Sequence, residues 1–183
     1  MIRDGVFCVG RSLNGPEAFP FVLPFSSPAP VHMPDPTAGR DLSEQEALRR
    51  AKRRQLDARG IDPYPTAWDV TAHAQGLLDA FDDDAHDPDT GQRLDASLAG
   101  RITSIRVMGK SAFFDVQDAT GTIQAYVRKG DLPEGFFAEV FTELFDIGDI
   151  VGLAGYVFRT RMGEVTVRVE DLQLLAKALR PPP

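Results

Sequence analysis

The stretch that most constrains the fold is a pair of alternating runs, residues 112–117 and 122–128, on either side of the polar turn 118–121. Such runs around a short turn are typical of a β-hairpin, and Gly121 can adopt a positive φ there. Because successive side chains of a strand point to opposite faces, the pairing predicts one apolar face. That face, which we expect in the core, consists of Phe114, Val116, Ile123, Ala125 and Val127.

The opposite face of this hairpin is polar except for two aromatic rings. It carries Phe113, Asp115, Gln117, Gln124, Tyr126 and Arg128. The rings allow two interpretations, cross-strand packing or a platform on which nucleobases stack. In the second, the amide of Gln124 offers both a donor and an acceptor to a base edge.

Composition limits the classes of protein to which the chain can belong. With 183 residues, 43% of them hydrophobic, it can bury one substantial core with appendages. No run is long and apolar enough to span a membrane and no secretory signal is visible, so we expect a cytoplasmic protein without a membrane partner. Cys8 is the only cysteine and the three histidines are scattered. We therefore expect no disulfide framework, no metal, no cofactor and no catalytic residue.

Charge is unevenly distributed along the chain. The net charge of −7 argues against a protein that coats nucleic acid non-specifically. Residues 49–59 nevertheless contain one acid and six cations, namely Arg49, Arg50, Lys52, Arg53, Arg54 and Arg59. These cations form either a solvated helix face or a surface offered to a phosphate backbone.

The first half of the chain predicts extensions rather than a core. Residues 1–41 are rich in proline, which predicts a disordered or loosely docked extension. Residues 42–96 predict a helical extension that ends in an acidic loop. Its first helix starts at a capping box formed by Ser43 and Glu46 and ends near Gly60. Its second runs from about residue 70 to 81, with Asp69 as the cap and an apolar stripe against a partner surface.

From residue 97 the pattern changes to strands. The first strand shifts its apolar phase between Ile102 and Ile105, which predicts a bulge, with Gly100 relieving crowding. After the central hairpin, a phenylalanine-rich helix over 134–145 precedes two more strands joined by a turn at 161–163. Three strands, a helix and two strands is the order of the OB-fold, a five-stranded Greek-key barrel that binds oligonucleotides over its second and third strands. We therefore expect a β fold with α additions, and an OB-fold domain over residues 97–179.

Several ordered segments between about residue 42 and the last residue resemble the N-terminal region of class II lysyl-tRNA synthetases. They are residues 60–65 (GIDPYP), 99–102 (AGRI), 108–113 (MGKSAF), 116–118 (VQD), 121–127 (GTIQAYV), 146–152 (DIGDIVG), 160–164 (TRMGE) and 174–181 (LLAKALRP). In that family this region is an OB-fold that binds the tRNA anticodon.

The resemblance implies roles for individual residues. Phe113 would stack on the central anticodon uridine, Gln124 would bond a base edge, and Glu164 would take part in the same recognition. Arg101, Arg106 and Lys110 would contact phosphates, because cations position a nucleic acid while base contacts specify it. Tyr126 completes the set of candidate nucleic-acid-binding residues.

The chain also departs from the family pattern. None of the class II catalytic motifs is present, and residues 180–183 look like a truncated linker. The chain is therefore either a truncated portion of a synthetase or a naturally short relative. The main hypothesis is a module that binds the anticodon loop of lysine tRNA and is inactive alone. The alternatives are a non-catalytic part of a lysine-tRNA ligase assembly, homodimeric or joined by a catalytic domain on another chain, and a generic OB-fold module for single-stranded nucleic acid or protein.

Overall fold

The computed structural model describes residues 43–86 and 92–180. The predictions for residues 1–41, for the part of the acidic loop at 87–91 and for the last three residues lie outside the described residues. No helix in the described part of the chain is long and apolar enough to cross a membrane. The elements are α1 (Glu44–Ala58), α2 (Ala74–Ala80), β1 (Leu94–Met108), β2 (Ser111–Gln117), β3 (Thr122–Arg128), η1 (Phe136–Phe141), α3 (Thr142–Leu144), β4 (Ile150–Arg159) and β5 (Val165–Ala176).

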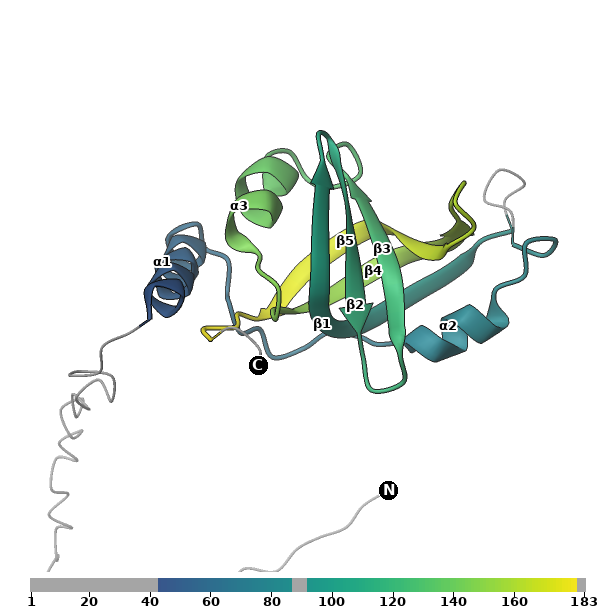
Figure 1. The fold of residues 1–183 in the computed structure, drawn as a ribbon, viewed down its shortest axis with the longest axis horizontal. Coiled ribbons are helices and arrows are strands. Elements are labelled where there is room, and N and C mark those ends of the chain that lie inside the picture. Colours follow the sequence, from purple (N-terminus) through teal and green to yellow (C-terminus); the bar gives the residue numbers. More distant parts are fainter. Residues whose placement is uncertain (1–42, 87–91, 181–183) are drawn as a thin grey trace, which may run out of the picture. The chain divides into compact units, whose positions relative to one another are not determined.

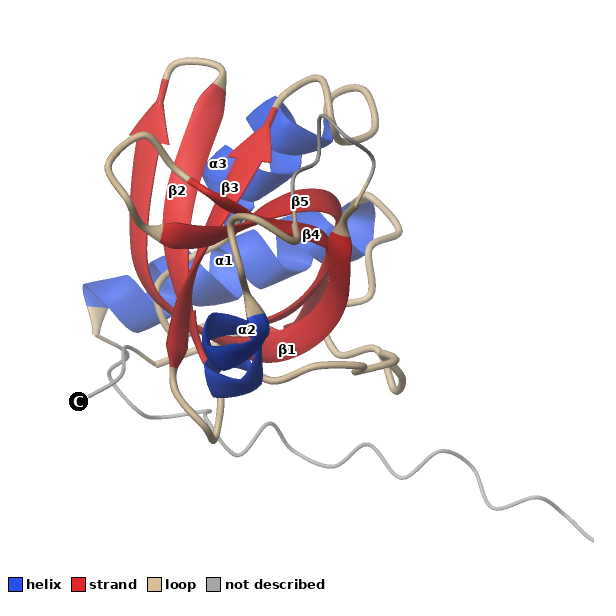
Figure 2. Ribbon diagram, turned by 90° about the vertical axis from the view of Figure 1, so that its right-hand side faces the viewer, coloured by secondary structure: helices blue, strands red, loops and turns tan. Residues whose placement is uncertain are grey.

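The five strands close into one barrel in the order β1-β2-β3-β5-β4 (Figures 1 and 2). Only β3 and β5 pair in parallel, and the other neighbours are antiparallel. This is the predicted OB-fold with helical additions. A closed barrel leaves no unpaired sheet edge.

The central hairpin confirms the predicted register. Phe114, Val116, Ala125 and Val127 are fully buried, and Phe113 lies opposite Tyr126 on the outer face. The turn differs in one respect, because Gly121 does not adopt a positive φ. Instead Asp118 Oδ1 accepts hydrogen bonds from the backbone N–H groups of Thr120 and Gly121, which holds the turn without a left-handed residue.

The predicted bulge in β1 is present. The pairing with β2 shifts register between Ile102 and Ser104, so Ile102 points into the core while the strand bends to serve two sides of the barrel. A Cβ on Gly100 would lie 2.6 Å from the backbone oxygen of Gln117. The close approach of the two strands therefore requires glycine at this position.

A phenylalanine-rich segment plugs one end of the barrel. The sequence predicts a single helix over 134–145; the segment instead begins as the π-helical turn η1 and continues into the short α3. Phe141 lies 5.3 Å from Phe114 and 5.4 Å from Phe145, measured between ring centroids. These aromatic contacts anchor the plug to the inner face of the central hairpin.

The second predicted helix is shorter than expected and is capped differently. Residues 71 and 72 lie outside the helix, with both backbone N–H groups donating to the Ser97 carbonyl, and α2 begins at Ala74. The prediction that Asp69 caps the helix is wrong. Asp118, from the β2–β3 turn, accepts a hydrogen bond of 2.8 Å from the N–H of Ala74. A carboxylate from a distant turn thus replaces a local cap, and α2 packs beside β3 as Figure 1 shows.

Ser43 caps the start of helix α1 as predicted, since its Oγ accepts a hydrogen bond from the N–H of Glu46. Two cations of this helix dock it onto the rest of the domain. Arg49 donates to the carbonyls of Ile147 and Ala178, and Lys52 Nζ lies 2.6 Å from an Asp146 carboxylate oxygen. Of the two leucines of the helix, Leu56 is buried while Leu48 remains 58% exposed.

A buried ion network completes this docking. The ammonium of Lys177 donates to Asp146, Asp149 and the carbonyl of Leu144 at 2.6 to 2.8 Å. Burial raises the pKa of Asp149, although Lys177 acts in the opposite direction. Burial also acts to raise the pKa of Asp146, but hydrogen bonds from Lys177 and Lys52 outweigh it and lower that pKa. The network joins α1, the loop before β4 and the chain after β5.

Candidate nucleic-acid interface

Two aromatic rings form the centre of the outer face of β2 and β3. Phe113 and Tyr126 are directly opposite each other in the strand pairing, and their ring centroids lie 4.8 Å apart at an interplanar angle of 44°. The two rings therefore pack against each other across the strands, as the first of the two interpretations expects. Both rings nevertheless remain partly exposed. A base can stack on a ring whose position is already held by its neighbour.

Gln124 lies beside the rings and is more enclosed than the polar-face pattern suggests. Only 7% of the residue is exposed. Its Nε2 donates to Glu164 Oε2 at 2.8 Å, and its Oε1 accepts from the hydroxyl of Thr166 at 3.0 Å. The parallel pairing of β3 with β5 places Gln124 opposite Thr166, which the hairpin pattern alone did not reveal.

The turn between β4 and β5 brings Glu164 to this point. Gly163 adopts a φ of 90°, and Thr160 Oγ1 accepts a hydrogen bond from the N–H of Glu164. The tight turn directs the carboxylate toward β3. Beside this turn lies a hollow of about 210 Å³, lined by Arg106, Met108, Phe113, Gln124, Thr160, Met162 and Glu164.

Arg106 joins this hollow because it pairs with Phe113 across β1 and β2. The structure thus brings together five of the seven predicted residues: Arg106, Phe113, Gln124, Tyr126 and Glu164. Ionic, stacking and hydrogen-bonding groups converge on one outer surface, which suits an unpaired base with its phosphate nearby.

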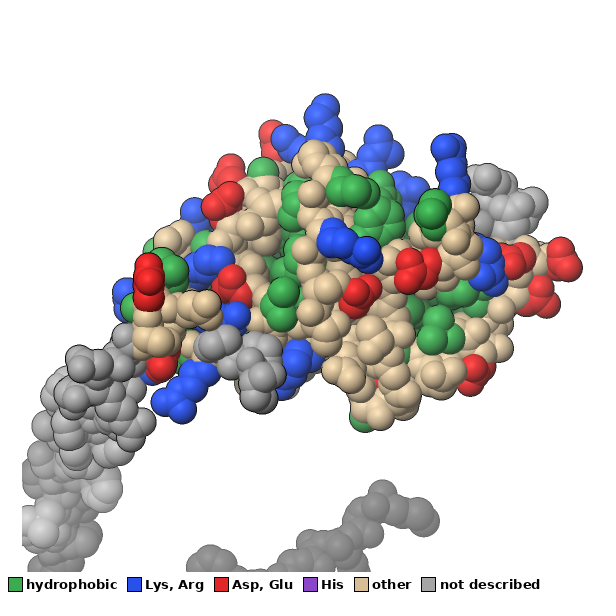
Figure 3. All heavy atoms as spheres, viewed as in Figure 1, with side chains coloured by type: hydrophobic (Ala, Val, Ile, Leu, Met, Phe, Trp, Pro, Cys, Tyr) green, Lys and Arg blue, Asp and Glu red, His purple; other side chains and the backbone are tan. Residues whose placement is uncertain are grey.

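Lys110 lies at the tip joining β1 and β2, next to Arg128 and Lys129, which the sequence analysis did not include among the candidate site residues. Ser111 pairs with Arg128, and the N–H of Lys129 donates to the carbonyl of Lys110. Lys110, Arg128 and Lys129 are exposed and make no ion pair with another described residue. Figure 3 shows basic side chains projecting from this upper end of the molecule. The hairpin register, followed to its last pair, could have revealed them. We call Lys110, Arg128 and Lys129 the basic tip.

Arg101 lies apart from the other candidates. Its guanidinium donates to the carbonyl of Gly148 at 2.8 Å, at the end of the barrel where β1 meets β4. Five residues along a strand separate it from Arg106 by about 16 Å.

In the part of the chain that the structure describes, no group of three or more His, Cys, Asp or Glu side chains could hold a metal ion.

The closed five-stranded barrel defines the class of this domain as an OB-fold. Residues 96–175 match the model of the tRNA anti-codon family, described as an OB-fold nucleic acid binding domain. This segment is therefore an OB-fold domain that matches this family.

Full-length relatives narrow the class further. The chain is 43% identical over 148 residues to a lysine-tRNA ligase of Porphyromonas gingivalis, which covers 78% of this chain and 25% of the ligase. It is also 42% identical over 144 residues to a lysine-tRNA ligase of Tolumonas auensis, which covers 79% of this chain and 28% of that ligase. The domain is thus homologous to part of lysine-tRNA ligases, and the chain spans about a quarter of their length.

Proposed function

We propose that this domain binds tRNA through the anticodon loop of lysine tRNA. The observation that carries the proposal is the convergence of the Phe113 ring, the Gln124 amide and the Glu164 carboxylate around one hollow. A base lying on Phe113 meets the remaining donor and acceptor positions of Gln124 at its edge. Homology to lysine-tRNA ligases supports lysine tRNA as the partner.

The domain performs recognition and no chemistry of its own in this proposal. The carboxylate of Glu164 and the amide of Gln124 are hydrogen-bonded to each other in the hollow, an arrangement that suits recognition of a base edge. Aminoacylation then depends on a catalytic region outside this segment. A titration of the chain with lysine, ATP and lysine tRNA is expected to yield no charged tRNA, and any turnover would contradict this part of the proposal.

The binding test compares two RNA stem-loops with the same stem, one carrying the lysine anticodon and one a scrambled loop. Fluorescence anisotropy is expected to show tighter binding of the lysine anticodon. Phe113→Ala is expected to weaken that binding by about 1–3 kcal/mol, the range found for loss of one base–aromatic stack. The matched control is Tyr64→Ala, which removes another partly exposed ring, 44% exposed in the connector after α1.

Each outcome of this titration has a distinct meaning. Equal affinity for both stem-loops would favour a general single-stranded RNA module over an anticodon reader. Equal losses of RNA affinity in Phe113→Ala and Tyr64→Ala would show that Phe113 is not part of the binding site. Absence of binding to either stem-loop would overturn the proposal.

A further inference from the structure

The outer row that begins at the candidate site continues around the barrel. Across β3 and β5, Tyr126 pairs with Arg168, and across β5 and β4, Arg168 pairs with Tyr156. Residues paired in this way point to the same face of a sheet. Phe113, Tyr126, Arg168 and Tyr156 therefore form one outward row over four strands.

Ring contacts make this row continuous. The ring of Phe158 lies 6.3 Å from Tyr126 and 6.4 Å from Tyr156, measured between centroids. Aromatic pairs interact at such separations. Through Phe158, ring contacts therefore connect the stacking surface of the candidate site to Tyr156, beside Arg168.

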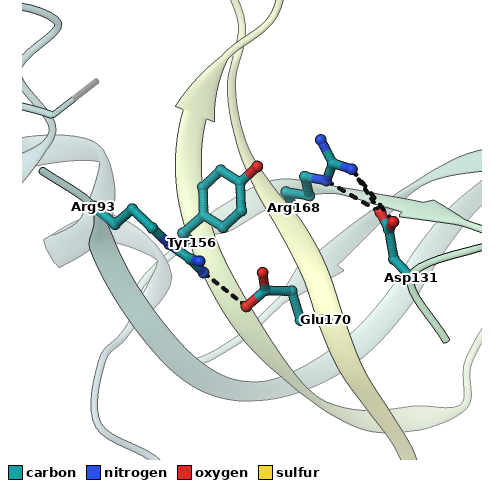
Figure 4. A pocket seen from close by; sticks show the side chains of 5 residues that line it. All are labelled: Arg93, Asp131, Tyr156, Arg168 and Glu170. Carbon is teal, nitrogen blue, oxygen red and sulfur yellow. Dashed lines mark hydrogen bonds and ion pairs between the residues drawn. The ribbon is translucent and has the colours of Figure 1, made fainter. Parts of the chain in front are cut away.

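At Tyr156 the row opens into a second pocket of about 400 Å³, lined by Arg93, Asp131, Tyr156, Arg168 and Glu170 (Figure 4). The guanidinium carbon of Arg93 lies 4.1 Å from the centre of the Tyr156 ring, and Arg93 also pairs with Glu170 at 2.7 Å. Arg168 pairs with Asp131 at 3.0 Å. Ion pairs therefore hold both guanidinium planes in place.

The charges of this pocket indicate what it can bind. Both guanidinium groups are already paired with carboxylates, and Arg93 also pairs with Asp95 at 3.2 Å. A phosphate entering the pocket would therefore meet carboxylates at close range. A nucleobase is uncharged, carries both donors and acceptors, and stacks on guanidinium planes as well as on aromatic rings. About a third of the Arg93 and Arg168 side chains is exposed, which leaves their planes accessible.

We propose that this pocket is a second base-binding subsite, which takes a nucleobase of the same RNA strand at a distance from the base on Phe113. The inference rests on the proposed function and extends it. Three strand spacings separate Phe113 from Tyr156, about 14 Å along the surface. That exceeds the stacked step of about 3.4 Å between neighbouring nucleotides, so the two bases are not adjacent. OB-folds bind about 4–16 nucleotides, which accommodates both subsites.

The test compares two all-uridine RNAs, one long enough for the Phe113 site alone and one long enough to reach Tyr156. A third RNA has the longer length but lacks the bases beyond the Phe113 site. The wild-type chain is expected to bind the longer RNA about tenfold more tightly than the other two, because one additional base stacks. The abasic RNA separates the contribution of the base from that of the added phosphates.

Variants assign this gain to the pocket. Arg93→Ala and Tyr156→Ala are expected to abolish the tenfold gain and to leave affinity for the short RNA unchanged. Tyr156→Phe keeps the ring and should retain the gain. So should the control Arg53→Ala, which removes an arginine of similar exposure that pairs with Asp57 on α1. Circular dichroism of each variant checks folding, and Arg93→Ala answers the question if Tyr156→Ala does not fold.

The results distinguish this inference from the proposed function. A gain that persists in Arg93→Ala, or that the abasic RNA shows equally, overturns the second subsite and leaves the Phe113 site intact. Binding of neither the short RNA nor a lysine stem-loop would overturn both proposals together.

Discussion

Gln124 donates from Nε2 to Glu164 Oε2 at 2.8 Å, across a gap of forty residues in the chain. The hydroxyl of Thr166 donates to the other end of the same amide. Since the amide is held at both ends, its orientation is set before any ligand arrives. One N–H and one lone pair remain, and they present a fixed donor and acceptor toward the hollow.

Replacing Glu164 should therefore impair base discrimination more than folding. In Glu164→Ala the amide of Gln124 loses the partner that orients its Nε2, so the wrong base edge is rejected less strongly. We expect affinities for stem-loops that differ only at the middle anticodon base to converge, while the free energy of unfolding stays near that of the wild type. Glu143→Ala, an exposed acid on the short α3, is the control. Retained discrimination in Glu164→Ala would contradict the role of this pair.

The basic tip should govern the salt dependence of RNA binding. Each phosphate contact on a single strand contributes about 0.7 to the slope of log affinity against log salt concentration. Lys129→Ala is expected to reduce the slope by about that amount and to weaken all RNA sequences alike. Arg54→Ala, an exposed cation on α1, should leave the slope unchanged. An equal reduction in both variants would mean that the tip has no special position on the RNA path.

Asp118 should make the stability of the fold depend on acid pH. Burial acts to raise its pKa, but hydrogen bonds from the Ala74 N–H, from the Thr120 hydroxyl and N–H, and from the Gly121 N–H outweigh it and hold the pKa at about 2. A carboxylate with a lowered folded pKa stabilises the fold fully above its ordinary pKa of about 3.9. That contribution, about 2 kcal/mol, is lost as the pH falls from there toward about 2.

Urea unfolding of Asp118→Asn checks this dependence. The variant is expected to be less stable than the wild type near neutral pH, and the difference should shrink at about pH 3. Asp79→Asn, on the exposed side of α2, is the control and should change stability little at either pH. A difference for Asp118→Asn that stays constant with pH would show that the cap acts through shape rather than charge.

Gly152 offers a test of the connector that precedes the barrel. A Cβ at this position would clash with the indole of Trp68, the only tryptophan of the chain. Gly152→Ala is therefore expected to displace the indole, shift its fluorescence to longer wavelength and destabilise the fold by about 1–3 kcal/mol. In Gly76→Ala the added Cβ meets nothing within 4 Å, and a better helix former replaces glycine. An unchanged emission spectrum in Gly152→Ala would contradict the packing of Trp68 on β4.

Sequence patterns predicted local structure well where side chains alternate or repeat. The alternation around residues 118–121 predicted which residues of the hairpin are buried, and the phase shift in the first strand predicted the bulge near Ile102. Ser43 was found as a helix cap because capping operates over three residues. Each of these signals depends only on neighbours in the chain.

The errors arose where the partner is distant. Asp69 was the obvious local cap for α2. Instead, Asp118 from another turn accepts the hydrogen bond of the Ala74 N–H, and the helix starts at Ala74. For the cations of α1 the sequence allowed a solvated face or a phosphate-binding surface, whereas Arg49 and Lys52 bind the chain near Asp146 and Ala178. Arg101 was grouped with Arg106 by sequence, but Arg101 lies in the middle of β1 and donates to the carbonyl of Gly148, while Arg106 lies near the end of the strand. The contact of Arg101 with a phosphate therefore stays a prediction.

The sequence by itself determined the succession of strands along the chain, the buried face of the hairpin and the side chains that point away from it, because strand alternation is a property of the backbone. Only the tertiary structure decided that Gln124, Glu164 and Thr166 form one bonded cluster and that the aromatic row reaches Tyr156. Both depend on the parallel pairing of β3 with β5 and on closure of the barrel. Such contacts join residues forty positions apart, and no local pattern encodes which strands will become neighbours.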